Sequence, residues 1–301
     1  MNQDKVDVVI PFVNCNDTNW MQDYTQTLKC FSIPKERFRS WNTLKYWFRG
    51  IAKYAPYVNN IVLILARESQ IPDWLDTSKV RIVYHRDFMP QQCLPTFSSS
   101  AIESFLYNIE GLSEKFIYFN DNMFLINPTT LEDFFLNGVP RMQFIFRDKY
   151  NHHSIFRVQC RNSLDMITDA LHLERYPKEK LFLSNHSVAT LLKSTLDSVK
   201  ELCEDKILRT VTPTRSPCNV HKHIYEYYQF YTDNYTSDYS LQFSYLEMSD
   251  NLDEMKRMVL DENLQLICLN DSDKIKDYKK TRAELLRIFE LKFPDKCKYE
   301  I

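Results

Sequence analysis

The sequence contains very little glycine: of 301 residues only three are glycine, at positions 50, 111 and 138. Dinucleotide-binding loops (G-x-G-x-x-G) and phosphate loops (G-x-x-x-x-G-K-[ST]) need several closely spaced glycines, so both motifs are excluded. If the chain binds a nucleotide, other groups must hold the phosphates. The search therefore turns to metal ligands and side-chain cations.

Long apolar runs are also missing. The longest, such as Ile61 to Ala66, are about a third of the roughly 20 residues that a membrane-spanning helix needs. Near the N-terminus, Asp7 interrupts an apolar segment that would otherwise resemble the core of a signal peptide. We therefore predict no transmembrane segment and a cytoplasmic location, with peripheral contact at the inner face of the cell membrane as the closest association with a membrane.

The charge is nearly balanced. The chain has 38 basic and 40 acidic residues and a formal net charge of -2. No overall field attracts polyanions, so nucleic acid is not an expected partner.

The eight cysteines lack the spacing of a metal or redox motif. They stand at positions 15, 30, 93, 160, 203, 218, 268 and 297, without a C-x-x-C pair. This spacing excludes a zinc knuckle and a thioredoxin-like motif. We predict reduced thiols that are mostly buried.

The first 130 residues alternate between strand and helix patterns. Hydrophobic residues make up 44% of the chain, which is enough for a sizeable core. Short apolar or β-branched runs predict strands over 6–13, 60–66, 80–85 and 116–119, and helical spacing predicts helices over 40–54 and 98–110. This alternation is typical of a mostly parallel sheet flanked by helices. We predict that these residues form the nucleotide-binding half of the domain.

The second half has a different pattern. Residues 150–262 are expected to form a mainly helical addition, with helices near 164–173, 188–202 and 224–231. A strand over 264–269 is expected to return to the first sheet, and residues 281–291 to form a helix. We therefore predict one interwoven catalytic domain over 1–301, with 263–301 as the returning strand and last helix.

Polar clusters follow three of the predicted strands. These are Asn14 with Asp17, Asn120-Asp121-Asn122, and Asn270 with Asp271. Ligands of open parallel sheets bind beyond the carboxyl ends of the strands, so the three clusters are expected to converge on one site. The alternative is that Asn and Asp simply end strands because they favour turns.

The cluster Asn120-Asp121-Asn122 stands between two apolar runs. A carboxylate in that position is costly unless it is paired or binds a metal. Magnesium prefers oxygen ligands and keeps phosphate oxygens in its shell. One Asp with neighbouring amide groups therefore suits a complex of Mg²⁺, or Mn²⁺, with a diphosphate.

Several segments together form a recognisable pattern. The first is Asp7-Val-Val-Ile-Pro-Phe-Val-Asn14. The second and most specific block comprises segments 42–56, 70–75, 85–87, 94–104 and 111–122, and weaker blocks are Asn185-His186-Ser-Val with Thr214-Arg215-Ser, and Ile267-Cys-Leu-Asn-Asp271. These blocks resemble the Stealth family of sugar-phosphate transferases, which make microbial polysaccharides and include the animal N-acetylglucosamine-1-phosphotransferase. The resemblance favours a Rossmann-like α/β fold of the GT-A type with a helical addition.

The resemblance implies transfer of hexose 1-phosphate from a nucleotide-sugar, a UDP-sugar by expectation, to a glycan hydroxyl. Nucleoside monophosphate would leave, and the product would belong to a capsule or cell-wall polysaccharide. The expected partners are the nucleotide-sugar donor and an oligosaccharide or polysaccharide acceptor. The oligomeric state stays open, with a homo-oligomer among the alternatives.

The resemblance also suggests roles for individual residues. Asp121, Asn122 and Asp271 would hold the metal. Arg49 and Arg215 would neutralise the diphosphate, and His186 would act as general base. For Arg49 the alternative is a surface position on its helix, and a lone His is more often structural.

The remaining candidates would bind substrate or assist the reaction. Asp7 lies on the opposite face of its strand from Asn14 and is either a catalytic or nucleotide-binding group or the partner of a helix dipole. The preceding serines would contact sugar hydroxyls. Glu103 is also placed to complete a helix-capping box with them, and capping explains the presence of at least one of these serines as well as a sugar contact does. The residues expected to contact substrate are Asn14, Asn42, Lys45, Arg49, Ser98, Ser99, Glu103 and Asn120.

One departure from the family pattern affects the metal. The usual Asn-Asp-Asp is Asn120-Asp121-Asn122 here, so one carboxylate is missing. Two other functions stay open. One is a metal-dependent glycosyltransferase that uses the same metal-diphosphate site and releases nucleoside diphosphate. The other, which the missing carboxylate makes plausible, is a non-catalytic subunit that binds a glycan or nucleotide-sugar.

Overall fold

The computed structural model describes residues 5–30, 38–149 and 153–301. Its strands are β1 (Val6–Pro11), β2 (Val58–Leu65), β3 (Arg81–Tyr84), β4 (Lys115–Tyr118), β5 (Met123–Leu125), β6 (Phe135–Leu136), β7 (Val139–Pro140), β8 (Phe144–Arg147), β9 (Leu181–Ser184), β10 (Ala189–Leu192), β11 (Phe243–Glu247) and β12 (Leu266–Asn270). Its α-helices are α1 (Thr18–Leu28), α3 (Leu44–Tyr54), α4 (His85–Phe88), α5 (Ser99–Ser104), α6 (Ile155–Ala170), α7 (Lys193–Leu208), α8 (His223–Tyr231), α9 (Leu252–Val259) and α10 (Tyr278–Lys292).

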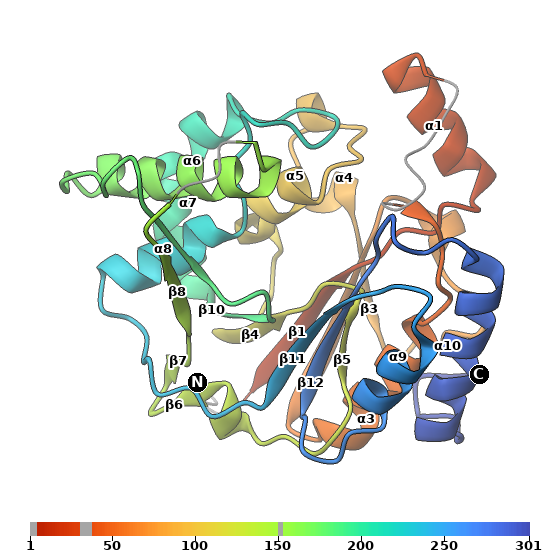
Figure 1. Ribbon diagram of the computed structural model, residues 1–301. Coiled ribbons are helices and arrows are strands. Elements are labelled where there is room, and N and C mark those ends of the chain that lie inside the picture. Colours follow the sequence, from red (N-terminus) through yellow and green to blue (C-terminus); the bar gives the residue numbers. More distant parts are fainter. Residues whose placement is uncertain (1–4, 31–37, 150–152) are drawn as a thin grey trace.

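The central sheet has the strand order β10-β4-β1-β2-β3 (Figure 1). Strands β3, β2, β1 and β4 are parallel, and β10 adds to β4 in the antiparallel direction. The order 3-2-1-4 is that of a Rossmann-like half, in which the chain changes direction of winding between β1 and β4. The predicted α/β fold with a mostly parallel sheet flanked by helices is confirmed.

Each face of this sheet is covered by its own hydrophobic core. Side chains alternate along a strand, so Val8 and Ile10 point into one core and Val9 into the other. The first core contains α3, α9 and α10, and the second contains α5, α6, α7 and α8. Figure 1 shows α3 and α10 on one side of the strands and α6 on the other.

A second sheet of three strands has the order β11-β12-β5. β12 is parallel to β11 and antiparallel to β5. The expectation that the strand near 264–269 returns to the first sheet is therefore wrong. β10 already occupies the outer edge of β4, so the late strand pairs instead with β5, which begins directly after Asn122.

The segment after residue 150 is less helical than predicted. The expected helix over 188–202 begins only at Lys193, because Ala189–Leu192 forms β10. These residues are buried against β4, and a short, fully buried and mostly apolar segment suits a strand as well as a helix. The expected helix over 40–54 begins at Leu44, because Asn42 has a φ of 56° that a right-handed helix excludes.

Two simpler expectations have mixed outcomes. All eight cysteines are free thiols, but only Cys160, Cys203 and Cys268 are buried, so the prediction of mostly buried thiols is wrong. Among the described residues, no helix is long and apolar enough to cross a membrane.

Gly50 allows α3 to lie directly against β5. A Cβ atom at this position would come within 2.5 Å of the carbonyl oxygen of Leu125. We expect Gly50→Ala to destabilise the protein by about 1–3 kcal/mol, despite the better helix propensity of alanine, because the backbone must move. Urea denaturation measures the change. Lys53→Ala, at an exposed position of the same helix, should stay within about 0.5 kcal/mol of wild type, and equal stability of Gly50→Ala would contradict the close packing.

Candidate active site

A cleft opens where β1 and β4 end, at the change in winding direction. Its walls come from the residues after β1 (Phe12, Val13), the segment 38–44 before and at the start of α3, the residues after β4 (Asp121, Asn122), and Leu269 of β12. Ligands of such sheets bind at this point. The three strand ends therefore meet at one cleft, but of the three polar clusters expected to converge there, only Asn120-Asp121-Asn122 contributes to its lining, through Asp121 and Asn122.

Asp121 is the acidic side chain of this cleft. The side chain is accessible to solvent, yet the surrounding protein displaces much of the water and raises the pKa of its carboxyl to about 6. Beside it, Oδ1 of Asn122 is buried without a hydrogen-bond partner among the described residues. A carboxylate and an unsatisfied amide oxygen are suitable ligands for a hard cation.

The N-terminus of α3 lies at the same cleft. Thr43 and Leu44 contribute to its wall, and Thr43, the N-cap residue, makes no side-chain capping hydrogen bond. The first turn of α3 carries no acidic residue. Free N–H groups and the positive end of the helix dipole therefore favour an anion there.

Asp271 does not contribute to a metal site in this structure. Nε of Arg39 donates to its Oδ2 at 2.7 Å, Nη2 of Arg39 donates to its Oδ1, and Nε1 of Trp41 donates to Oδ2 at 2.8 Å. These donors occupy both oxygens, so the predicted role of Asp271 as a metal ligand and catalytic group is corrected. The carboxylate instead fixes Arg39, which lines the cleft.

Arg49 and Lys45 lie away from the cleft, against the C-terminal segment. Arg49 is almost completely buried, and its Nε and Nη2 donate to the two oxygens of Glu300 at 2.7 and 2.9 Å. Its Nη1 donates to the carbonyl oxygen of Phe293 at 2.6 Å, and Nζ of Lys45 lies 3.9 Å from Glu290. The predicted contact of Arg49 with a diphosphate is therefore wrong, because its donors are already used inside the fold.

Asp7 lies near the beginning of β1, at the opposite edge of the sheet from the cleft. Its carboxylate is 1% exposed and accepts hydrogen bonds from Nδ2 of Asn59 and Asn60 and from the backbone N–H of Ser113. These bonds tie three segments of the sheet together. The predicted catalytic role of Asp7 is replaced by a structural one.

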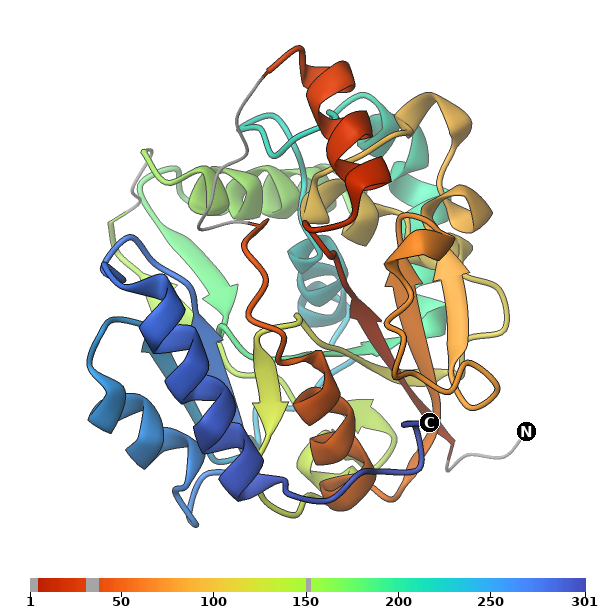
Figure 2. The same cartoon turned by 90° about the vertical axis from the view of Figure 1, so that its right-hand side faces the viewer.

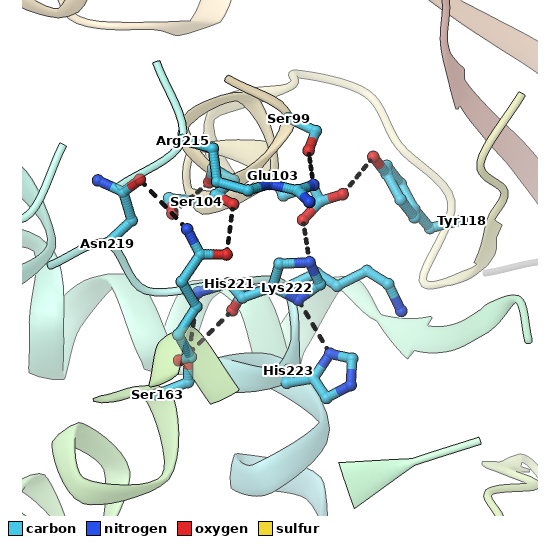
Figure 3. A network of polar contacts seen from close by, with 12 residues as sticks. Ser99, Glu103, Ser104, Tyr118, Ser163, Arg215, Asn219, His221, Lys222 and His223 are labelled. Carbon is cyan, nitrogen blue, oxygen red and sulfur yellow. Dashed lines mark hydrogen bonds and ion pairs between the residues drawn. The ribbon is translucent and has the colours of Figure 1, made fainter. Parts of the chain in front are cut away.

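Glu103 lies at the centre of a buried polar network (Figure 3). Its Oε1 accepts a hydrogen bond from the hydroxyl of Tyr118 at 3.0 Å, and its Oε2 lies 3.3 Å from Nε2 of His221. Burial raises the pKa of Glu103, and the cations Lys222 and Arg215 oppose that rise. Glu103 therefore neither caps its helix nor reaches a substrate, in contrast to both predictions, and instead positions its neighbours.

The network continues through two histidines. Nδ1 of His221 lies 3.0 Å from Nδ1 of His223, which is also 3.2 Å from Oε2 of Glu226. The same carboxylate lies 3.6 Å from Nζ of Lys222. Burial, followed by neighbouring cations and rings, lowers the pKa of both histidines well below 6.5, so both are neutral at pH 7.

Arg215 is fixed at the edge of this network. Its Nη2 donates to Oγ of Ser99 at 2.8 Å. The loop that carries it is held by Gln159, which donates to the carbonyl oxygen of Ser216 at 2.9 Å, and by Asn219, which accepts from the Ser216 N–H at 2.8 Å. The structure thus gives Ser99 a positioning role toward a cation.

His186 lies near the same cations. Its ring packs edge-on against Phe156 and Tyr245, with ring centroids 6.2 and 5.4 Å apart. Burial is the largest cause that lowers the pKa of His186 to about 4, and Lys222 and Arg215 contribute. A neutral imidazole with cations nearby suits a proton acceptor beside an anionic substrate.

The other predicted substrate contacts have different surroundings. Asn42 lines the cleft, where its Oδ1 accepts a hydrogen bond from Ser40 at 2.6 Å. Oδ1 of Asn14 accepts from the N–H of Asn16 within its own loop. The hydroxyl of Ser98 is fully buried, which corrects its predicted sugar contact, and Asn120 forms the turn after β4 by accepting the Met123 N–H at 3.1 Å.

Tyr118 connects the cleft to the buried network. It ends β4 three residues before Asp121, and its hydroxyl donates to Glu103. Burial raises the pKa of Tyr118 well above 10, with further contributions from Glu103 and Asp121 and an opposing one from Arg215. Asp121 and Arg215 are 94 positions apart in the sequence. Both therefore influence the pKa of the same hydroxyl group.

Comparison with known proteins identifies the family. Residues 37–142 match the family model of Stealth protein conserved region 2. An exopolysaccharide phosphotransferase of Lactiplantibacillus plantarum is 30% identical in sequence, in an alignment that covers 98% of this chain and 96% of that protein. The chain belongs to the Stealth family. The resemblance predicted from its motifs is confirmed.

Other relatives of this Stealth protein are similar along their whole length. A receptor polysaccharide phosphotransferase of Streptococcus gordonii is 28% identical, and a capsular polysaccharide phosphotransferase of Streptococcus pneumoniae is 27% identical, each over 99% of both chains. The solved apo structure of mouse xyloside xylosyltransferase 1 aligns with 88% of this chain and 98% of its own, at 10% identity. The TM-score of 0.36 is below the level at which two structures share a fold.

Several residues of the site are not among the sequence predictions. Arg39 lies within residues 37–142 but before the segment 42–56 that carries the resemblance, and His221, Lys222 and Glu226 follow Thr214-Arg215-Ser. The run His-Lys-His before an aromatic helix was a usable signal, because three basic residues next to a buried helix need partners. No local pattern pairs them with Glu103, which lies more than 100 residues earlier.

The buried pair Arg49–Glu300 should stabilise the fold without acting in the reaction. Burial opposes ionisation of Glu300, but the hydrogen bonds from Arg49 and the Cys297 N–H outweigh it and lower the pKa of this carboxyl. We expect Arg49→Met to cost about 3–5 kcal/mol of unfolding free energy at pH 7, because it leaves a buried carboxylate unpaired.

A lowered pKa fixes the direction of the pH dependence. The advantage of wild type over Arg49→Met should be complete above the usual glutamate pKa of 4.5 and be lost as the pH falls through the lower folded-state value. Urea titrations at several pH values measure it. Lys45→Met is the matched control, since its partner is 3.9 Å away and half exposed. A loss of transfer activity in Arg49→Met with unchanged stability would contradict this assignment.

Proposed function

We propose that this Stealth protein transfers hexose 1-phosphate from a nucleotide-sugar to a hydroxyl group of a glycan and releases nucleoside monophosphate. Its relatives are named as phosphotransferases of capsular, receptor or extracellular polysaccharide. The observation that carries the proposal is the cleft itself, where Asp121 and the unsatisfied Oδ1 of Asn122 lie beside the uncapped N-terminus of α3. Oxygen ligands for a hard cation and a helix N-terminus together suit a metal-bound diphosphate.

The proposed donor places its diphosphate in the cleft. The uncapped N-terminus of α3 supplies partial positive charge there, in place of Arg49, and the Arg39 guanidinium, which is paired with Asp271, lines the same wall. Arg215, whose Nη2 donates to Oγ of Ser99, would supply a further cation to the bound donor. Phosphoryl transfer depends mainly on positioning and charge neutralisation, which these groups provide.

A divalent metal fits this donor set only together with substrate. Asp121 and Oδ1 of Asn122 would hold it, but among the described residues no group of three or more His, Cys, Asp and Glu side chains is arranged around an ion. Mg²⁺ commonly binds through one or two protein groups and substrate phosphates. When bound, Mg²⁺ or Mn²⁺ would neutralise charge on the diphosphate.

In the proposed reaction, the acceptor hydroxyl attacks the phosphorus nearest the sugar. A bond forms between the acceptor oxygen and this phosphorus, and the bond from the phosphorus to the nucleoside phosphate breaks. His186 takes the proton of the hydroxyl. Because the donor's negative charge offsets Lys222 and Arg215, which lower the pKa of His186, we expect donor binding to make this imidazole a stronger base.

The leaving group distinguishes this reaction from ordinary glycosyl transfer. Incubation with UDP-glucose or UDP-N-acetylglucosamine, Mg²⁺ and an acceptor glycan should yield UMP, measured by chromatography. Asp121→Ala and His186→Ala should each lower the rate by at least about a hundredfold. His172→Ala, at an exposed position on the turn after α6, should keep the wild-type rate. Release of UDP alone would contradict the proposal, and binding without any turnover would favour a non-catalytic subunit.

The raised pKa of Asp121 predicts weaker metal-dependent binding in mild acid. A protonated carboxyl is a poor ligand, so affinity for Mg²⁺ with UDP-glucose should fall by about tenfold per pH unit below about pH 6. UDP-glucose is the suitable probe because its diphosphate does not titrate in this range. Calorimetry from pH 5 to 7.5 measures the affinity.

Two variants test the source of that pH dependence. Asp121→Asn should bind weakly at every pH, while Asp273→Asn, at an exposed position after β12, should retain the wild-type profile. Equal affinity of wild type at pH 5 and pH 7.5 would show that Asp121 does not hold the metal.

A further inference from the structure

A second cavity of about 740 Å³ lies beyond the carboxyl ends of β2 and β3. This volume is within the range of roughly 300–1,000 Å³ that is typical of small-molecule sites. In Figure 2, α1 lies above this end of the strands. The lining residues are Trp20, Asp23, Ala66, Arg67, His85, Arg86, Met89, Gln91, Leu94, Pro95, Thr96 and Phe97.

His85 is the unexplained polar group of this cavity. It is 7% exposed and lines the cavity wall, yet its imidazole makes no hydrogen bond to any residue that the structure describes. Its one ring contact is the edge-on packing with Phe88, at 6.5 Å between centroids. Buried polar groups nearly always have a partner, so the imidazole is available to a bound molecule.

The other groups around the cavity favour an uncharged ligand. Arg67 forms an ion pair with Asp23, and Arg86 forms one with Glu68. Both cations are thus neutralised, and a phosphate group would have to break these pairs. The remaining wall includes the rings of Trp20 and Phe97, which suit a flat, partly apolar molecule.

The protonation state of His85 agrees with such a ligand. Burial lowers the pKa of its imidazole to about 4, so the ring is neutral at pH 7. A neutral imidazole offers one donor and one acceptor. The edge of a nucleobase presents the complementary acceptor and donor groups.

The position of the cavity fits the geometry of the proposed donor. Neighbouring strands are about 4.8 Å apart, and β2 and β3 lie next to β1 on the side away from β4. The cavity is therefore about 10 Å from the cleft at the ends of β1 and β4, measured across the same edge of the sheet. That separation is comparable to the distance from a diphosphate to the base of the same nucleotide.

We propose that this cavity binds the nucleobase of the donor, with His85 as the residue that recognises its edge. The inference rests on the proposed nucleotide-sugar donor. It adds a base-specificity site to the cleft that holds the diphosphate, and it accounts for the open imidazole of His85.

Binding of UMP, CMP, GMP, AMP and inorganic pyrophosphate, measured by calorimetry on the whole chain with Mg²⁺, tests the inference. Wild type should bind one nucleoside monophosphate at least tenfold more tightly than pyrophosphate. His85→Ala should lose about fivefold to tenfold of that affinity and bind pyrophosphate as wild type does.

A second pair of variants covers the case in which His85→Ala fails to fold. Gln91 is exposed at the rim of the cavity, and the next residue, Gln92, is exposed but does not line it. Gln91→Trp should fill the cavity and weaken binding of the preferred monophosphate by about tenfold, with pyrophosphate binding unchanged. Gln92→Trp should bind both as wild type does.

The outcomes separate this inference from the proposed reaction. Wild-type affinity for the monophosphate in both His85→Ala and Gln91→Trp would overturn the base site, even if UMP release from a UDP-sugar is observed. Binding that depends on His85, together with no turnover of any nucleotide-sugar, would support the base site and contradict the proposed transfer.

Discussion

The backbone hydrogen bond from Leu269 N–H to the Asn122 carbonyl, at 2.9 Å, is the contact on which the site depends. It joins the end of β12 to the point where the chain leaves the first sheet after β4 and enters the second as β5. Asp121 is held between two sheets rather than on a free loop. Catalytic groups carried by such rigid elements keep their geometry better than groups on loops.

The buried network beside Tyr118 follows the rule that interior charges need compensation. Two carboxylates, Glu103 and Glu226, face two cations, Lys222 and Arg215, while the histidines remain neutral. A cluster in which positive and negative charges compensate each other can remain buried away from water. An arriving diphosphate would change this balance, so donor binding and the electrostatics near His186 are coupled.

Much of the fold was predictable because it depends on local patterns. The strands near Val9, Val62 and Tyr118 are apolar on both faces, and their alternation with helices predicts parallel pairing. The partner of β12 was not predictable in the same way. It depended on β10 occupying the edge of β4, which is a consequence of tertiary packing and not of any local signal.

The roles of the individual site residues also depend on contacts that no local sequence pattern reveals. The motif drew attention to Asp121, which lines the cleft, and to Arg215, but it did not separate groups that face the cleft from groups that hold the fold. Arg49 and Asp7 stand in segments with a strong family resemblance, yet their donors and acceptors are used by Glu300 and by Asn59, Asn60 and Ser113. Such pairings join distant segments, and only the folded structure shows them.

The position of β10 also affects how copies of this protein meet in solution. An open strand edge offers unpaired backbone groups to another chain and promotes aggregation. β10 is the edge strand on one side of the central sheet, where its Leu192 N–H and Thr190 carbonyl are bonded to the Gln229 side chain. On the other side β3 has only four residues, begins with Arg81 and is followed by Arg86. Among the described residues, no strand covers β3. Its shortness and charge therefore protect the sheet from edge-to-edge polymerisation.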